Sequence, residues 1–433
     1  MKRTLLMTVV LLVSMVAARA ENWPQWRGPN FNGSTAEKNL PTTWSETENV
    51  AWKTPLPGYS GATPVVWGDN IFVSSPDPQK NLALFCINRK DGSVRWQKTI
   101  ATGDRESGRN NMASPSPVTD GKRVIILYGT GDLAALDYSG NILWQRNIGK
   151  DYGKFAIMWI YGSSPLLYKD KLYIQVLQRD TPADYAHAQD GKMSRESYLL
   201  CIDPATGKDL WRQIRPSDAK METLESYSTP IPFVRGKQTE ILILGGDVLT
   251  SHDPATGKEL WRGGGWNPTR GEWMRIVPSP VAAGDVLLAP GPKKTPLMAF
   301  RAGGSGTLSD SDVAWQNKSI TPDVCTPLYY DGKLFVLDGD RKVVARLDPK
   351  TGEKLWQGSL PAKDVMRASP TGADGKIYSL DEQGNVFVVD AGDEFKLLAT
   401  VAMGEGPIRS SIVASNGQLF IRTAKNLWCI GKK

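Results

Sequence analysis

The sequence predicts an all-β fold: an eight-bladed β-propeller of four-stranded blades, which an N-terminal strand closes by completing the C-terminal blade. Three observations lead to this prediction. A turn phrase that ends in tryptophan recurs along the chain, a second phrase containing proline precedes the copies, and one spare strand lies before the first repeat. The repeats extend through residues 21–433, which we therefore expect to form a single domain.

The turn phrase occurs in three close copies and two looser ones. The close copies start at Asp203, Asp253 and Asp348, and each reads Asp-Pro-Xaa-Thr-Gly with a tryptophan four residues after the glycine. Aspartate and proline favour the opening of a turn, and glycine accepts the positive φ that closes it, so each copy predicts a hairpin whose second strand carries the tryptophan. We expect these rings to fill the gaps between neighbouring blades, at Trp52, Trp96, Trp144, Trp211, Trp261, Trp315 and Trp356.

The second phrase is a small residue followed by proline at the head of an apolar strand. Seven heads contain Pro64, Pro117, Pro165, Pro230, Pro280, Pro327 and Pro370, and an eighth at 409–412 keeps the pattern without proline. Successive heads lie 42 to 65 residues apart, and an alternating strand such as 333–337 follows each. Four short strands per unit of roughly 40–50 residues are typical of a propeller blade.

The two ends of the repeat region predict how the ring closes. The last unit, 412–430, stops one strand short, whereas 49–53 resembles a tryptophan-carrying strand that lacks its own unit. Pairing the two completes the eighth blade and leaves no open edge between first and last blades.

The first twenty residues read as a signal peptide. A basic start and an apolar run precede Ala18-Arg19-Ala20, a typical cleavage site, so we expect a periplasmic or secreted protein that begins at Glu21. This segment carries three basic residues and no acid, so its removal lowers the net charge from +7 to +4. Such a mild charge without a basic block argues against nucleic acid as a partner. We expect a monomer without a direct membrane anchor.

The sequence contains no motif for a metal or a redox-active thiol. Cys86, Cys201, Cys325 and Cys429 are far apart, and the two histidines, His187 and His252, form no cluster with them. We expect four buried free thiols. Cys86 and Cys429 are the one pair worth testing, because ring closure makes their blades neighbours. Equivalent strands lie roughly 10 Å apart there, too far for a disulfide.

A candidate binding site follows from the way a propeller is built. The first strand of each blade starts at one mouth of the central channel, so the residues just before each head form a ring around that mouth. The candidates in this ring are Arg275, Arg367, Arg409, Tyr161, Tyr227 and Asp323, with Tyr59 and Asn111. Convergent arginines beside tyrosines suit a carboxylate, a phosphate or an acidic peptide. In the alternative, the three arginines pair with Glu225, Asp323 and Glu405 and only line the channel.

One insertion shares this face. The segment 179–197 joins a second strand to a third, as do the shorter loops that carry two cationic pairs. These pairs are Lys293-Lys294 and Arg341-Lys342.

On its turn phrase, the sequence resembles the PQQ-like propeller repeat family, and the opening 22–29 resembles that of secreted PQQ-binding-like repeat proteins. The resemblance implies one of two functions. Quinoprotein dehydrogenases oxidise alcohols or sugars with pyrroloquinoline quinone (PQQ) and calcium, and many use adjacent cysteines, which this chain lacks. BamB-like proteins are eight-bladed scaffolds of outer-membrane barrel assembly. We therefore expect a binding or scaffolding protein without a cofactor or a catalytic residue. Its partner is another protein or an anionic ligand. The alternative is a PQQ-dependent dehydrogenase with calcium.

Overall fold

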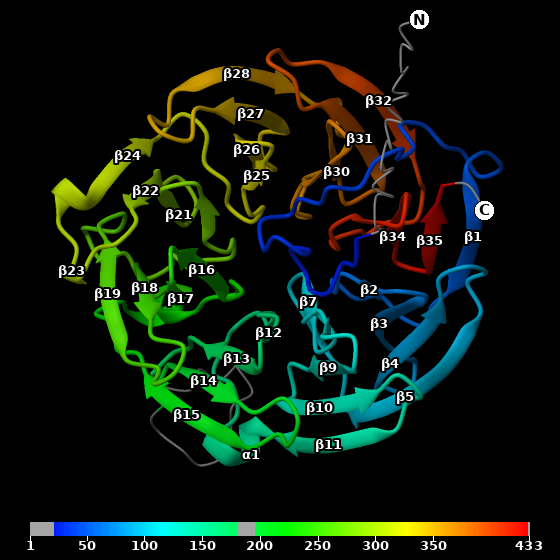
Figure 1. Cartoon of the computed structure of the whole chain (residues 1–433), viewed down its shortest axis with the longest axis horizontal. Coiled ribbons are helices and arrows are strands. Elements are labelled where there is room, and N and C mark those ends of the chain that lie inside the picture. The colour runs from blue at the N-terminus through cyan, green and yellow to red at the C-terminus, as the bar shows by residue number, and fades with distance from the viewer. Residues whose placement is uncertain (1–20, 181–194, 432–433) are drawn as a thin grey trace, which may run out of the picture.

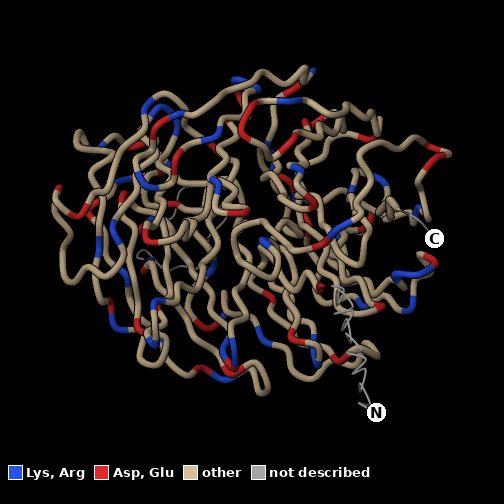
Figure 2. Tube along the Cα trace, turned by 45° about the horizontal axis from the view of Figure 1, so that its top comes forward, with Lys and Arg blue, Asp and Glu red and all other residues tan. Residues whose placement is uncertain are grey.

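The computed structural model describes residues 21–180 and 195–431, which form eight blades arranged in a ring around a central axis (Figure 1). The predicted eight-bladed all-β propeller is therefore confirmed. Within the described residues, no helix is long and apolar enough to cross a membrane. Basic and acidic residues are interspersed along the chain trace (Figure 2).

Each of the first four blades runs from an inner strand to an outer one in sequence order. Blade 1 contains β2 (Val65–Trp67), β3 (Asn70–Pro76), β4 (Asn81–Asn88) and β5 (Val94–Thr102). Blade 2 contains β8 (Val118–Thr119), β9 (Arg123–Leu127), β10 (Asp132–Asp137) and β11 (Ile142–Asn147). Blade 3 contains β12 (Leu166–Tyr168), β13 (Lys171–Val176), β14 (Tyr198–Ile202) and β15 (Asp209–Ile214). Blade 4 contains β16 (Ile231–Arg235), β17 (Gln238–Gly245), β18 (Val248–His252) and β19 (Glu259–Gly264).

The next three blades repeat this order. Blade 5 contains β20 (Val281–Ala283), β21 (Val286–Pro290), β22 (Leu297–Arg301) and β24 (Val313–Asn317). Blade 6 contains β25 (Leu328–Tyr330), β26 (Lys333–Asp338), β27 (Val343–Leu347) and β28 (Lys354–Ser359). Blade 7 contains β29 (Thr371–Ala373), β30 (Lys376–Leu380), β31 (Asn385–Asp390) and β32 (Leu397–Ala402). The connections hold β6 (Glu106–Ser107), β7 (Asn110–Asn111), α1 (Ile148–Tyr152), η2 (Met221–Leu224), β23 (Gly306–Thr307) and η3 (Asp310–Asp312).

Blade 8 joins the two ends of the chain, as predicted. Its inner strands are β33 (Val413–Ser415), β34 (Gln418–Arg422) and β35 (Asn426–Ile430), and its outer strand is β1 (Val50–Pro55) from the N-terminal side. β1 pairs antiparallel with β35, with Trp52 opposite Cys429 (Figure 1). The ring is thus closed by backbone hydrogen bonds between segments that lie almost 400 residues apart.

The outer tryptophans connect each blade to the next one. The indole of Trp52 in blade 8 donates to the carbonyl of Arg89 in the blade 1 turn at 2.8 Å, and its ring packs on Gly92 of that turn. Gly92 has φ +76°, and a Cβ there would come within 2.7 Å of the indole, so the turn requires glycine. The same contact with a turn glycine recurs for Trp96, Trp144, Trp211 and Trp315.

Trp261 departs from this pattern. Blade 5 has no turn phrase: its third and fourth strands are joined by the longer segment 302–312, in which β23 pairs in parallel with β19. The Trp261 indole therefore donates to the Glu240 carboxylate of its own blade at 2.9 Å, and only 2% of the residue is exposed. Trp261 is buried as expected, but its polar contact lies within its blade.

A ring of hydroxyl groups links the inner strands. The residue before each head proline is a serine or threonine, and Ser411 takes this place in the eighth head. In seven of these eight residues, the Oγ accepts a hydrogen bond from the backbone N–H of the equivalent residue in the preceding blade. Seven links of 2.7–3.1 Å run through Thr63, Ser116, Ser164, Thr229, Ser279, Thr326, Ser369 and Ser411. Among the described residues, the Ser411 Oγ has no hydrogen-bond partner, so this ring is broken between Ser369 and Ser411.

The N-terminal segment does more than supply β1. Residues 22–35 cross the centre of the ring, where Trp23 pairs with Val66 of blade 1 and Ser34 with Gly372 of blade 7 (Figure 1). Arg27 is buried and donates to the carbonyls of Pro327 and Pro370 at 3.1 and 3.0 Å. This segment links blade 1 to blades 6 and 7 across the axis, a feature that the repeat pattern did not predict.

The cysteines are free and buried, as expected, so Cys86 and Cys429 form no bridge. Burial raises the pKa of each thiol to about 12. The signal peptide, His187 and most of the 179–197 insertion lie outside the described residues.

His252 is part of the blade 4 turn. Its Nδ1 lies 2.9 Å from the Gly257 carbonyl and its Nε2 lies 3.0 Å from the Thr250 hydroxyl. A carbonyl only accepts, so Nδ1 carries the proton and Nε2 accepts from Thr250, whose oxygen in turn accepts from Arg215 at 3.3 Å. Burial lowers the pKa of His252 to about 4, so the folded state keeps the imidazole neutral.

This arrangement predicts a pH-dependent loss of stability. The unfolded histidine binds a proton below about pH 6.5, whereas the folded one resists it down to about 4. The neutral His252 therefore lowers stability nowhere above pH 6.5. As the pH falls from 6.5 to 4, the free energy of unfolding decreases, by about 3 kcal/mol at pH 4. Urea unfolding of wild type and His252→Asn between pH 7 and 4 measures it. Two curves that fall in parallel would contradict the assignment.

Candidate functional site

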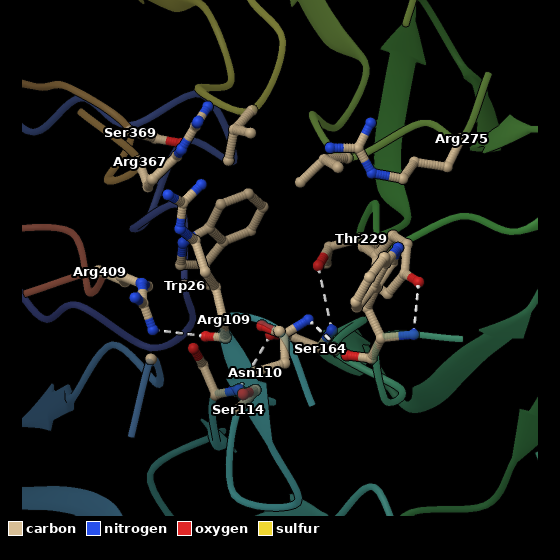
Figure 3. A pocket seen from close by; sticks show the side chains of 18 of the residues that line it. Trp26, Arg109, Asn110, Ser114, Ser164, Thr229, Arg275, Arg367, Ser369 and Arg409 are labelled. Atoms are coloured by element: carbon tan, nitrogen blue, oxygen red, sulfur yellow. Dashed lines mark hydrogen bonds between the residues drawn. The ribbon is translucent and has the colours of Figure 1, made fainter. Parts of the chain in front are cut away.

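A cavity of about 620 Å³ opens where the loops between consecutive blades converge on the axis (Figure 3). We call this side of the ring the loop face and the hollow the loop-face cavity. Its walls come from all eight of the loops that precede the first strands, and its floor includes Trp26 of the N-terminal segment. The lining residues are Trp26, Gly61, Gly108, Arg109, Asn110, Ser114, Ser116, Trp159, Gly162, Ser164, Glu222, Tyr227, Thr229, Arg275, Val277, Val324, Arg367, Ser369, Arg409 and Ser411.

The structure brings together most of the residues proposed from the sequence. Arg275, Arg367 and Arg409 line the cavity, and so does Tyr227. Tyr161 does not: it is buried behind the wall, stacks on Phe155 and donates to the Gln175 carbonyl at 2.8 Å. Asp323 does not line the cavity either.

Carboxylates behind the wall hold two of the arginines. An oxygen of Asp323 lies 3.7 Å from both Arg275 and Arg367, and Arg367 also pairs with Asp340 at 2.9 Å. Glu222 lies 4.0 Å from Arg275. The side chains of Arg367 and Asp323 are largely buried, so these ion pairs are partly shielded from water.

Arg409 has the densest contacts of the three. It binds both oxygens of Glu382, at 2.9 and 3.2 Å, and donates to the Tyr59 hydroxyl at 2.8 Å and to the Arg109 carbonyl at 2.7 Å. Burial alone would lower the pKa of Arg409, but its hydrogen bonds to Glu382 and Tyr59 outweigh this and raise it. Arg409 therefore fixes the geometry of this wall.

Two of the pairings considered from the sequence are wrong. Glu225 pairs with Arg179 instead of a ring arginine, and burial raises the pKa of this carboxyl group. Glu405 binds Lys53 at 2.6 Å beside the edge of blade 8, away from the cavity. The carboxylates that meet the ring arginines come from loops whose position around the axis depends on the folded ring, which explains why sequence reasoning chose other acids.

The sequence analysis missed most of the lining residues, including three with large side chains. Of these three, Trp26 lies in the N-terminal segment, Arg109 in the loop after blade 1 and Trp159 in the loop after blade 2. The indole of Trp159 donates to Glu222 at 2.8 Å, and its ring packs against Gly108. The sequence did contain one signal for Trp26 and Trp159. Neither follows a turn phrase, so neither could be explained as a tryptophan that packs between blades.

The described residues offer no obvious metal site. They contain no group of three or more His, Cys, Asp and Glu side chains arranged to hold a metal ion. The cavity's chemistry is instead that of guanidinium groups, hydroxyls and aromatic rings, which suits the recognition of an anion or a polar group.

Arg409→Gln should destabilise the fold, because it leaves Glu382, whose side chain is 9% exposed, without its main partner. We expect a loss of about 2–3 kcal/mol, near the lower limit for breaking a buried pair. Thermal and urea unfolding measure it. The double variant Arg409→Gln/Glu382→Gln should recover most of the loss, and a single variant as stable as wild type would contradict the bracing role.

Comparisons with solved structures reproduce this fold in proteins of different function. Europium-containing methanol dehydrogenase matches with a TM-score of 0.65 and 12% identity, covering 93% of this chain and 90% of that one. BamB from Moraxella catarrhalis matches with a TM-score of 0.60 and 15% identity, covering 88% and 98%. Quinohemoprotein alcohol dehydrogenase from Comamonas testosteroni matches with 0.65 and 11%, covering 95% and 81%. At these identities the likeness concerns the fold alone.

The search of curated proteins gave no match. The comparison with family models is more informative, because it tests the sequence itself. The model described as outer membrane protein assembly factor BamB matches residues 34–174 and 191–307, more than half of the chain. It spans the strands of blades 1 to 4 and the first three of blade 5, together with β1. The chain therefore belongs to the BamB family of PQQ-repeat propellers.

Proposed function

We propose that this protein is a binding or scaffolding component of the cell envelope that presents its loop face to another protein. Family membership supports a BamB-like role, and the signal-peptide pattern of residues 1–20 supports export to the periplasm or beyond. Fold alone does not distinguish a scaffold from an enzyme, so the proposal depends on the surface around the loop-face cavity.

Exposed apolar side chains beside this cavity carry the proposal. Trp159, Met221 and Trp273 are 38%, 40% and 58% exposed, and they come from three consecutive loops after blades 2, 3 and 4. Trp159 lines the cavity, and Glu222 next to Met221 does so too. Most other large apolar side chains that are exposed lie on the outer strands, as Leu210 and Leu355 do. Exposed tryptophans grouped at one hollow are typical of a protein-binding surface.

The residues of the cavity do not fit a quinone with calcium. Such a cofactor needs carboxylates free to bind the metal, whereas Asp323, Asp340 and Glu382 are paired with arginines. Glu222, the one carboxylate that lines the cavity, accepts a hydrogen bond from Trp159 at 2.8 Å and lies 4.0 Å from Arg275. The chain also lacks the adjacent cysteines on which alcohol-oxidising relatives stack the quinone. We therefore propose that the protein works without this cofactor, and we derive no catalytic step.

Titration calorimetry with PQQ and calcium should give no saturable heat, and a dye-linked assay with simple alcohols and sugars should give no turnover above a protein-free blank. Micromolar quinone binding together with dye reduction would favour the dehydrogenase alternative.

Replacing two exposed side chains should remove partner binding without affecting the fold. The immobilised wild type should capture a partner from the envelope fraction, and the immobilised double variant Met221→Ser/Trp273→Ser should capture much less of it. The reason is that exposed apolar anchors contribute much of an interface's binding energy. Quantitative mass spectrometry of the captured fraction measures this. The matched control is Val234→Ser, which changes a side chain 53% exposed near the opposite face. Equal capture by both variants, at equal melting temperature, would disprove this use of the loop face.

A further inference from the structure

The charge that lines the loop-face cavity is unbalanced. Four guanidinium groups face it, those of Arg109, Arg275, Arg367 and Arg409, and Glu222 is the one carboxylate among the lining residues (Figure 3). The other acids that pair with these arginines are set back from the surface. The lining thus presents positive charge and the carboxylates behind it carry negative charge, so the site offers guanidinium groups to an anion without a large net charge.

Two of these arginines have donors to offer. Among the described residues, the guanidinium groups of Arg109 and Arg275 donate no hydrogen bond, and their nearest carboxylate oxygens lie 3.5 Å and 3.7 Å away. Arg109 is also well exposed, with 54% of its side chain in solvent. Arg409, by contrast, is fully engaged by Glu382 and Tyr59. Arg109 and Arg275 are therefore the groups best able to bind an incoming carboxylate.

The N-terminal segment fixes one side of the cavity. Trp26 lines the cavity, and the segment that carries Trp26 is held by the buried side chain of the next residue, Arg27. An occupant that enters between the loops therefore meets this segment near the axis of the ring.

Apolar side chains lie both in the cavity and close to it in the chain. Trp159, Tyr227 and Val277 line the cavity, whereas the exposed Met221 and Trp273 lie one and two residues from the lining residues Glu222 and Arg275. A small organic acid would fill the hollow but leave Met221 and Trp273 exposed. An occupant that covers both regions has to be longer than the cavity is deep.

We propose that the loop-face cavity holds an acidic segment of the partner polypeptide, with its carboxylates on Arg109 and Arg275 and apolar neighbours against the Trp159 wall and Trp273. This inference rests on the proposed function and adds the chemistry of the segment that docks. It also assigns separate roles: Arg109 and Arg275 select for negative charge, whereas Met221 and Trp273 supply apolar contact.

A peptide titration tests the proposal. The probe is a fluorescein-labelled eight-residue peptide of alternating glutamate and phenylalanine, compared with the same peptide carrying glutamine in place of glutamate. Fluorescence anisotropy should show the acidic peptide binding about 30-fold more tightly, and Arg109→Gln/Arg275→Gln should remove this preference, because charge-assisted hydrogen bonds are lost. The matched control, Arg235→Gln/Lys237→Gln, removes the same charge near the opposite face and should bind like wild type.

Each result bears on the proposal. Equal affinity for both peptides, or an unchanged preference in the double variant, would overturn it, whereas capture that is still sensitive to Met221 and Trp273 would leave the proposed function intact. Glutarate that competes as strongly as the acidic peptide would instead indicate a site for small acids. If Arg275→Gln lowers the melting temperature, Arg109→Gln alone decides, because its largely exposed side chain makes no hydrogen bond that the fold requires.

Discussion

The hydrogen bond from a backbone N–H of one blade to the serine or threonine hydroxyl of the next is the contact on which the rest of the molecule depends. It recurs in seven links around the axis and fixes the angle and spacing of neighbouring inner strands. The tryptophan that packs on the next blade's turn does the same near the rim. With inner and outer contacts both set, the loops between blades have little freedom, and they converge on one mouth.

This rigid frame explains how the protein tolerates so many buried arginines. Arg27, Arg215 and Arg422 are almost fully buried, and burial lowers their pKa values to about 9, 9 and 10. Each donates to backbone carbonyls that the frame holds in place, such as Pro370 for Arg27 and Val248 for Arg215. At the loop-face cavity the same residue type is held by carboxylates instead, which leaves some donors facing the solvent.

The fold neither requires nor excludes catalysis. It matches dehydrogenases, a BamB protein and the computationally designed Ika8 protein with TM-scores of 0.57–0.65. What separates these functions is the chemistry of the loops. Here the acids are committed to arginines, and the exposed tryptophans are grouped beside the cavity. Both features suit molecular recognition better than catalysis, and both come from residues outside the repeat phrases.

The sequence by itself determined the blade count, the strand order, the closure by β1 and the packing of most outer tryptophans on the next blade, because each follows from local phrases at regular spacing. Only the tertiary structure decided which charges meet. Arg409 contacts the carbonyl of Arg109, 300 residues away, and Arg27 reaches Pro327 and Pro370 from the N-terminal segment. These contacts depend on where unrelated loops arrive around the axis. That position is set by the whole ring, and no single repeat encodes it.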